Sequence, residues 1–220
     1  SLTFFAAQGA LGLIRVLLVA VVLFAVVMVA LSAQVEGSRK AKELLLADDY
    51  DGLLQVAEDQ VEGGAHVLDV CVALTERTDE EEQMRQVVKR ISLTQPSPIQ
   101  IDSTEPEVIK TALEQIPGRA IVNSINLEAG PDKANVVVPL AVEHGAALIA
   151  LTIDEVGMAK TAEDKLRIAR RLVDFTCNKY GLPQSDLLID PLTFTIATGN
   201  EDDRKLAIWT LEGIEAIARE

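Results

Sequence analysis

Short apolar runs and helical patterns alternate without interruption from residue 37 onwards, and this alternation limits the fold more than any other feature. Helical patterns rich in Glu, Lys, Arg and Ala cover residues 40–47, 50–63, 80–94, 105–116, 132–144, 161–180 and 202–218. Apolar runs that predict strands lie between them, at residues 67–68, 99–101, 120–122, 148–153 and 187–189. Such alternation favours a parallel sheet with helical crossovers. The predicted fold class is therefore α/β.

A polar residue follows each of these apolar runs, and these residues are Asp69, Asp102, Asn123, Asp154 and Asp190. In a (β/α) barrel or an open doubly wound sheet, the carboxyl ends of the strands converge and ligands bind there. A single Asp in this place is equally well explained as the N-cap of the next helix, and for Asp154 the two interpretations are balanced. Capping alone would use Ser and Thr as often as Asp, so the whole set indicates a binding site.

Carboxylates with one amide suit a ligand that is rich in hydrogen-bond donors. A pterin is such a ligand, because its amino group and adjacent ring N–H form a two-donor edge that one carboxylate can bind. A divalent cation held by oxygen ligands would fit the same residues. The residue pattern therefore predicts a small-molecule or metal site and does not choose between them.

The charge and cysteine content exclude several other classes of protein. The chain has 20 Lys and Arg against 34 Asp and Glu, a formal net charge of −14, which disfavours binding to nucleic acid. Its two cysteines and two histidines have no spacing typical of a disulfide framework or a zinc site. Two buried thiols in a reducing compartment are expected, which agrees with a cytoplasmic protein.

The segment 1–36 differs in composition from the rest of the chain. Every residue from 16 to 31 is apolar, and Arg15 is the only charged residue before Glu36. A membrane helix through residues 10–33 is one interpretation, since the apolar stretch approaches the length that spans a bilayer. A foreign extension, or a strand and helix packed against a barrel, is the other. We therefore divide the chain into an apolar segment 1–36 and a barrel domain 37–220.

Several short motifs come in the order seen in the methyltetrahydrofolate-binding domain of cobalamin-dependent methionine synthases, and the chain resembles that family over residues 37 to 219. Each motif is weak alone, and the combination is specific. The motifs are Gly37-Ser38-Arg39-Lys40, Ile101-Asp102-Ser103, Ile121-Val122-Asn123-Ser124-Ile125, Ile153-Asp154-Glu155-x-Gly157, Ile189-Asp190-Pro191 and Ala197-Thr198-Gly199.

The resemblance implies a (β/α)8 barrel of the TIM type, related to dihydropteroate synthase. It implies that Asp102, Asn123 and Asp190 bind the pterin, with Asp69 a less certain member, and it assigns no catalytic side chain. In this family the methyl group on N5 of methyltetrahydrofolate passes to cobalamin carried by another domain, and then to homocysteine. The resemblance implies no metal bound by this chain itself.

Two departures from the family pattern leave alternatives open. Where the family has Gly-Glu-Arg-x-Asn at the end of its first strand, this sequence reads Ala30-Leu31-Ser32-Ala33-Gln34. The sequence also ends after the sixth helix of the pattern, so an incomplete barrel of about six βα units is expected. A methyltransferase acting on a corrinoid iron–sulfur protein and a non-catalytic fragment that keeps the fold are the alternatives. Dihydropteroate synthase is less favoured, because no basic phosphate-binding element is visible.

Overall fold

A computed structural model of the chain describes residues 37–194 and 202–220. The helices are α2 (Gly37–Leu46), α3 (Tyr50–Glu62), α4 (Glu80–Thr94), α5 (Pro106–Leu113), α6 (Asp132–Glu143), α7 (Ala162–Val173) and α8 (Leu206–Ala218). The strands are β1 (Leu68–Val70), β2 (Ile99–Asp102), β3 (Ile121–Ile125), β4 (Ala147–Leu151), β5 (Ile153–Asp154), β6 (Gly157–Met158) and β7 (Leu187–Asp190).

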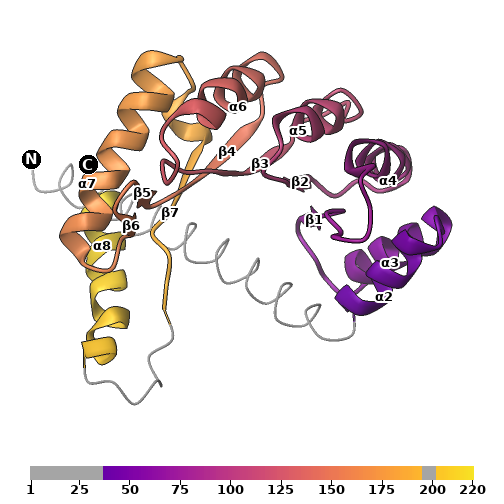
Figure 1. Cartoon of the computed structure of the whole chain (residues 1–220), viewed down its shortest axis with the longest axis horizontal. Helices are drawn as coiled ribbons and strands as arrows, with labels where there is room; N and C mark the ends of the chain where they lie inside the picture. The colour runs from indigo at the N-terminus through magenta and orange to yellow at the C-terminus, as the bar shows by residue number, and fades with distance from the viewer. Residues whose placement is uncertain (1–36, 195–201) are drawn as a thin grey trace, which may run out of the picture.

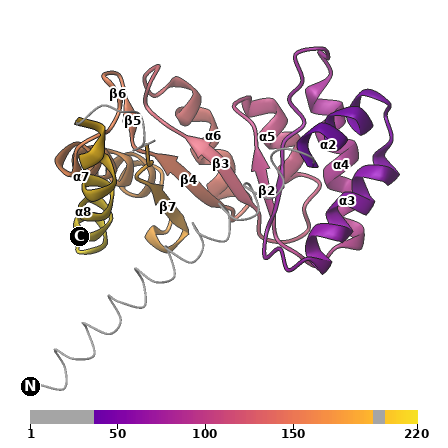
Figure 2. The same ribbon diagram turned by 90° about the horizontal axis from the view of Figure 1, so that it is seen from below.

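Five strands form one parallel sheet in the order β1-β2-β3-β4-β7. The helices lie on the outer side of this sheet and the strands on the inner side of a curved arc (Figure 1). Helices α2, α3 and α4 gather at one end of the arc, while α7 and α8 lie side by side at the other (Figures 1 and 2). This arrangement is part of a barrel wall and confirms the predicted parallel sheet with helical crossovers.

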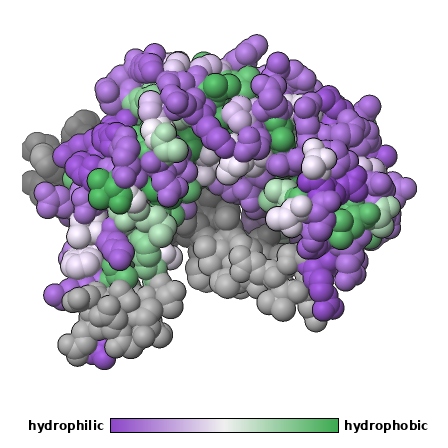
Figure 3. Space-filling model, in the orientation of Figure 1, coloured by the Kyte–Doolittle hydropathy of each residue, from purple (hydrophilic) through white to green (hydrophobic). Residues whose placement is uncertain are grey.

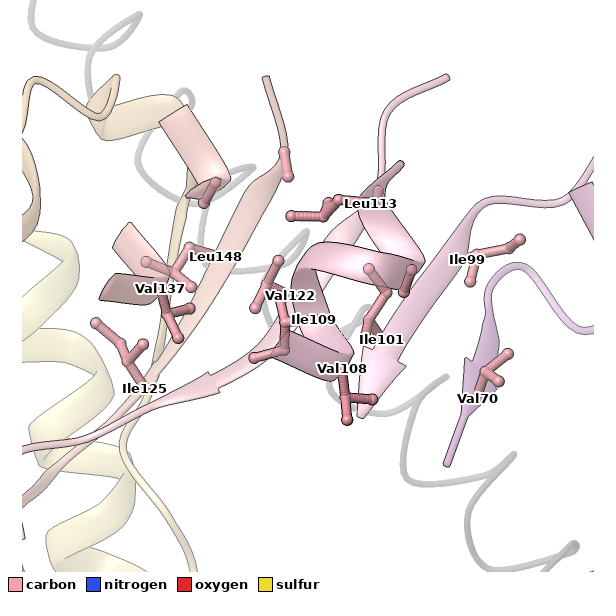
Figure 4. Packing of buried hydrophobic residues seen from close by; sticks show 14 of the residues in the cluster. Val70, Ile99, Ile101, Val108, Ile109, Leu113, Val122, Ile125, Val137 and Leu148 are labelled. Atoms are coloured by element: carbon pink, nitrogen blue, oxygen red, sulfur yellow. The ribbon is translucent and has the colours of Figure 1, made fainter. Parts of the chain in front are cut away.

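The hydrophobic core lies between the sheet and the helices. Alternate strand residues such as Leu68, Ile101, Val122 and Leu148 point towards the helices and are at most 2% exposed. Figure 4 shows side chains of neighbouring strands gathered beneath helix α5, close to Ile109. The outer surface above the helices is mainly hydrophilic, as Figure 3 shows. Each of these strands therefore has one face that packs against the helices, and its opposite face points away from them.

The structure corrects the prediction of a single strand over residues 148–153. Strand β4 ends at Leu151, and β5 pairs with β6 as a separate antiparallel hairpin. The predicted helix 161–180 agrees with the structure in extent, because α7 continues directly as a π-helix over Asp174–Lys179. The N-terminus of α7 is capped by Thr161, whose hydroxyl accepts a hydrogen bond from the Asp164 N–H at 3.1 Å.

The apolar stretch 10–33 and the rest of segment 1–36 lie outside the described residues, so the interpretations of this segment stay predictions. Within residues 37–194 and 202–220, no helix has the length and apolar character needed to cross a bilayer.

Candidate functional site

The sheet face opposite the helices, called here the inner face, carries the polar strand residues. Side chains alternate between the two faces of a strand. Because Ile101 and Val122 face the core, Asp102 and Asn123 face inward, and Asp69 and Gln100 do so for the same reason. The alternation that builds the core thus also places the predicted site residues together on one surface.

Two pairs of these residues lie directly opposite one another on adjacent strands. Asp102 of β2 pairs in register with Asn123 of β3. Asp69 of β1 pairs with Gln100 of β2. Asp69 lies inside β1 and Asn123 inside β3, rather than after the strands as the sequence pattern suggested. The structure therefore brings Asp69, Asp102 and Asn123 to the same part of the inner face.

Gln100 fixes the carboxylate of Asp69. Its amide Nε2 donates a hydrogen bond to Asp69 Oδ1 at 2.7 Å, and the Gln100 side chain is only 2% exposed overall. Asp69 as a whole remains exposed, but the partial burial of its carboxyl group raises its pKa. Hydrogen bonds from Gln100 and Asn123 lower the pKa and offset part of this shift. Sequence reasoning missed Gln100, although a polar residue inside the run 99–101 was a visible signal.

Asp102 is the most perturbed acid of the inner face. Burial and, to a lesser degree, the nearby negative charges of Asp69 and Glu80 together raise its pKa to about 6, against the opposing effect of a hydrogen bond from Cys71. The loop after Asp102 is held in place because Ser103 Oγ donates to Glu80 Oε1 at 2.8 Å. Close to neutral pH, Asp102 can therefore exist either as a hydrogen-bond acceptor or as a protonated donor.

Asp190 lies on the inner face at the far side of β4. It is the last residue of β7, and its register partner on β4 is Leu151. The backbone N–H of Leu192 donates to Asp190 Oδ1 at 2.8 Å, and the N–H of Thr152 donates to the Asp190 carbonyl at 3.0 Å. One carboxylate oxygen of Asp190 is therefore tied to the chain that follows.

Asp154 lies outside this group, contrary to the sequence pattern that placed it among the strand ends. It is 2% exposed and lies on the β5–β6 hairpin. Its Oδ2 accepts hydrogen bonds from Arg167 at 2.7 Å and from Arg171 at 3.1 Å. The hydrogen bond from Arg167 is the main reason why the pKa of Asp154 is lowered. Asp154 therefore anchors the hairpin to α7.

The inner face offers carboxylate and amide groups on neighbouring strands, an arrangement suited to a flat ligand with several hydrogen-bond donors. Among the described parts of the chain, no group of three or more His, Cys, Asp or Glu residues is arranged to hold a metal ion.

The chain belongs to the pterin-binding enzyme family, whose family model matches residues 34–219. This match confirms the family resemblance drawn from the short motifs. Members of the family have a TIM-barrel fold, and the curved parallel sheet of the described residues agrees with part of such a barrel.

Two curated relatives are methionine synthases. The chain is 41% identical over 197 residues to the protein of Mycobacterium leprae (strain TN), an alignment that covers 88% of this chain. It is also 41% identical over 186 residues to the protein of Mycobacterium tuberculosis (strain ATCC 25618 / H37Rv), which covers 83% of this chain. In both cases the chain spans 16% of the relative's length.

Proposed function

We propose that the inner face binds the pterin ring of methyltetrahydrofolate, with Asp102, Asn123 and Asp190 in contact with the ligand and Asp69 held beside them by Gln100. The observation that carries this proposal is the direct register pairing of Asp102 with Asn123 on the ligand side of two parallel strands. The Asp102 carboxylate can accept from the two-donor edge of a pterin, and the Asn123 amide can both donate and accept.

The reaction that we propose is transfer of the N5 methyl group to a cobalamin carried by another domain, as part of methionine synthesis. A tertiary amine is a poor leaving group, so N5 must gain a proton or a strong hydrogen bond as the methyl group departs. Cobalamin supplies the nucleophile. The residues of this chain orient the folate and provide electrostatic support, and both effects require a rigid set of polar groups.

The experiment is a calorimetric titration of the chain with methyltetrahydrofolate. Saturable binding is expected, and each of Asp102→Ala, Asn123→Ala and Asp190→Ala should weaken it by about tenfold or more, as expected for the loss of one charged or bidentate hydrogen-bonding group. Asp51→Ala is the control, because the Asp51 side chain is 97% exposed on α3.

Two results would count against the proposal. A folded chain that takes up no methyltetrahydrofolate would favour a fragment that keeps the fold without the function. Unchanged affinity in all three variants would refute the assignment of these residues. Where binding is found, adding reduced cobalamin or a corrinoid iron–sulfur protein to the loaded chain, and measuring demethylated folate, distinguishes the two proposed acceptors.

A further inference from the structure

The largest fully buried side chain of the described residues is a lysine, Lys165, which is 0% exposed. It lies near the start of α7, among the charged residues Glu163, Asp164 and Arg167. Taking an ammonium group out of water is costly unless hydrogen-bond acceptors replace the solvent. A lysine buried to this degree therefore needs a structural or functional reason.

The ammonium group of Lys165 meets three backbone carbonyl oxygens. Nζ donates to Ala159 O at 2.8 Å, to Pro191 O at 2.5 Å and to Leu192 O at 3.2 Å. Only a protonated amine has three N–H donors to match three acceptors. Burial lowers the pKa of Lys165, while the negative charge of Asp190 opposes that shift.

Two of these carbonyls belong to the residues that directly follow Asp190. Leu192 has a φ of +58°, a left-handed conformation that is unfavourable for a side chain of this kind. Its N–H donates to Asp190 Oδ1 at 2.8 Å, so the turn that fixes the carboxylate depends on this unusual backbone. Lys165 therefore holds the backbone on which the orientation of the Asp190 side chain depends.

Helix α8 is shaped to admit the lysine stem. A Cβ atom added at Gly213 would lie 2.8 Å from Lys165 Cδ and 3.3 Å from its Cβ. The hydroxyl of Thr210, also on α8, lies 3.2 Å from Leu192 O. The α7–α8 contact is thus built around one buried cation and the turn that it holds.

We propose that Lys165 is a positioning residue that holds the carboxylate of Asp190 in the orientation required by the pterin. This inference rests on the proposed function, since it assigns Lys165 a task at the same site. In this proposal Lys165 acts through the backbone of residues 191–192 and does not itself contact the ligand.

The first test measures the turn itself, without any ligand. In Lys165→Met, which keeps the length of the stem and removes the donors, amide hydrogen exchange at Leu192 should become about tenfold faster relative to the core amide of Val122. The control is Arg167→Met. It removes a cation of the same helix, but one that pairs with Asp154 and not with the turn, so the exchange rate of the Leu192 amide should be unchanged. Equal exchange at Leu192 in Lys165→Met and the parent chain would overturn the proposal.

The second test measures affinity for methyltetrahydrofolate in a double-mutant cycle. Lys165→Met should weaken binding by about tenfold in the parent chain and have little further effect in an Asp190→Ala background, because both changes remove the same contact. A loss of the same size in both backgrounds would show that Lys165 acts elsewhere, and the proposal would be wrong. If the parent chain binds no methyltetrahydrofolate, the proposed function fails, and the exchange experiment still decides whether Lys165 holds the turn.

Gly213→Ala provides a second variant in case Lys165→Met does not fold. Alanine favours a helix over glycine, so α8 should be retained, while the added methyl group displaces the lysine stem. Faster exchange at Leu192 and weaker binding in this folded variant are the expected results. A Gly213→Ala chain with the exchange rate and affinity of the parent would contradict the proposal.

Discussion

At the residue scale, the ionised carboxyl group of Asp102, a candidate ligand-binding residue, lowers the stability of the folded chain. Its carboxyl group is partly buried beside Asp69 and Glu80, and its pKa rises to about 6. A carboxyl group with a raised pKa binds its proton more tightly in the folded than in the unfolded chain. Stability therefore falls as the pH rises from about 4, the ordinary Asp pKa, towards 6, and the penalty is fully present at pH 7.

Asp102→Asn should therefore stabilise the chain at neutral pH. We expect the free energy of unfolding to rise by about 1–3 kcal/mol at pH 7, with the difference disappearing below about pH 4, where Asp102 is protonated in both states. Urea unfolding at both pH values measures this. Asp51→Asn, at an exposed position, should have little effect at either pH. A stabilisation by Asp102→Asn that is the same at pH 4 and pH 7 would contradict the electrostatic explanation.

Part of the candidate site could be predicted from single residues and part could not. Asp102 and Asn123 were found because each follows an apolar run in a regular pattern, and the structure pairs them directly. Lys165 was not found, because a lysine among acids on an amphipathic helix has the sequence pattern of a surface residue. Its burial depends on Gly213 of α8, a contact between distant parts of the chain that no local pattern contains.

At the element scale, the β5–β6 hairpin is the feature that the sequence pattern did not reveal. The run 148–153 is apolar throughout except for Thr152, so periodicity gives no sign that the sheet strand ends at Leu151. The helices and the sheet strands were predicted within a few residues, because their apolar spacing and capping residues are local signals. The hairpin instead depends on tertiary ion pairs between Asp154 and α7.

Asp154→Ala should lower the free energy of unfolding by about 2 kcal/mol, because it removes a buried carboxylate together with the charged hydrogen bonds that it accepts from Arg167 and Arg171. The loss is not larger because both arginines are half exposed and can be hydrated in the variant. Glu155→Ala is the matched control. Glu155 is an exposed carboxylate that pairs with Arg171 and not with Arg167. Denaturant unfolding at pH 7 compares the two. Because the pKa of Asp154 is lowered, its contribution should decline progressively as the pH falls below about 4, the ordinary Asp pKa, and through the lower pKa of the folded chain. Equal losses in both variants would refute this role of Asp154.

At the scale of the whole molecule, packing is concentrated on one side of the sheet. Leu148 is 0% exposed and faces the helices, whereas its neighbour Ile149 is half-buried and faces inward. The same alternation recurs in β1 and over residues 121–123 of β3, whereas in β2 the inward-facing Gln100 is buried as well.

Leu148→Ala and Ile149→Ala therefore test where the stability of the fold resides. We expect Leu148→Ala to lower the free energy of unfolding by about 3–4 kcal/mol, and Ile149→Ala by about 1–2 kcal/mol, since a partly exposed side chain loses less contact and leaves no closed cavity. Thermal or urea unfolding of the two variants gives the comparison. A larger loss for Ile149→Ala would mean that the inner face is packed as densely as the core.

The division of each strand into a packed face and an inner face also bears on how such a barrel can change over generations. Adjacent residues such as Ile101 and Asp102 are subject to different selection, one for a stable fold and the other for the ligand that the chain recognises. A lineage can then acquire a new ligand by exchanging alternate strand residues, while the packed layer beneath them is left intact.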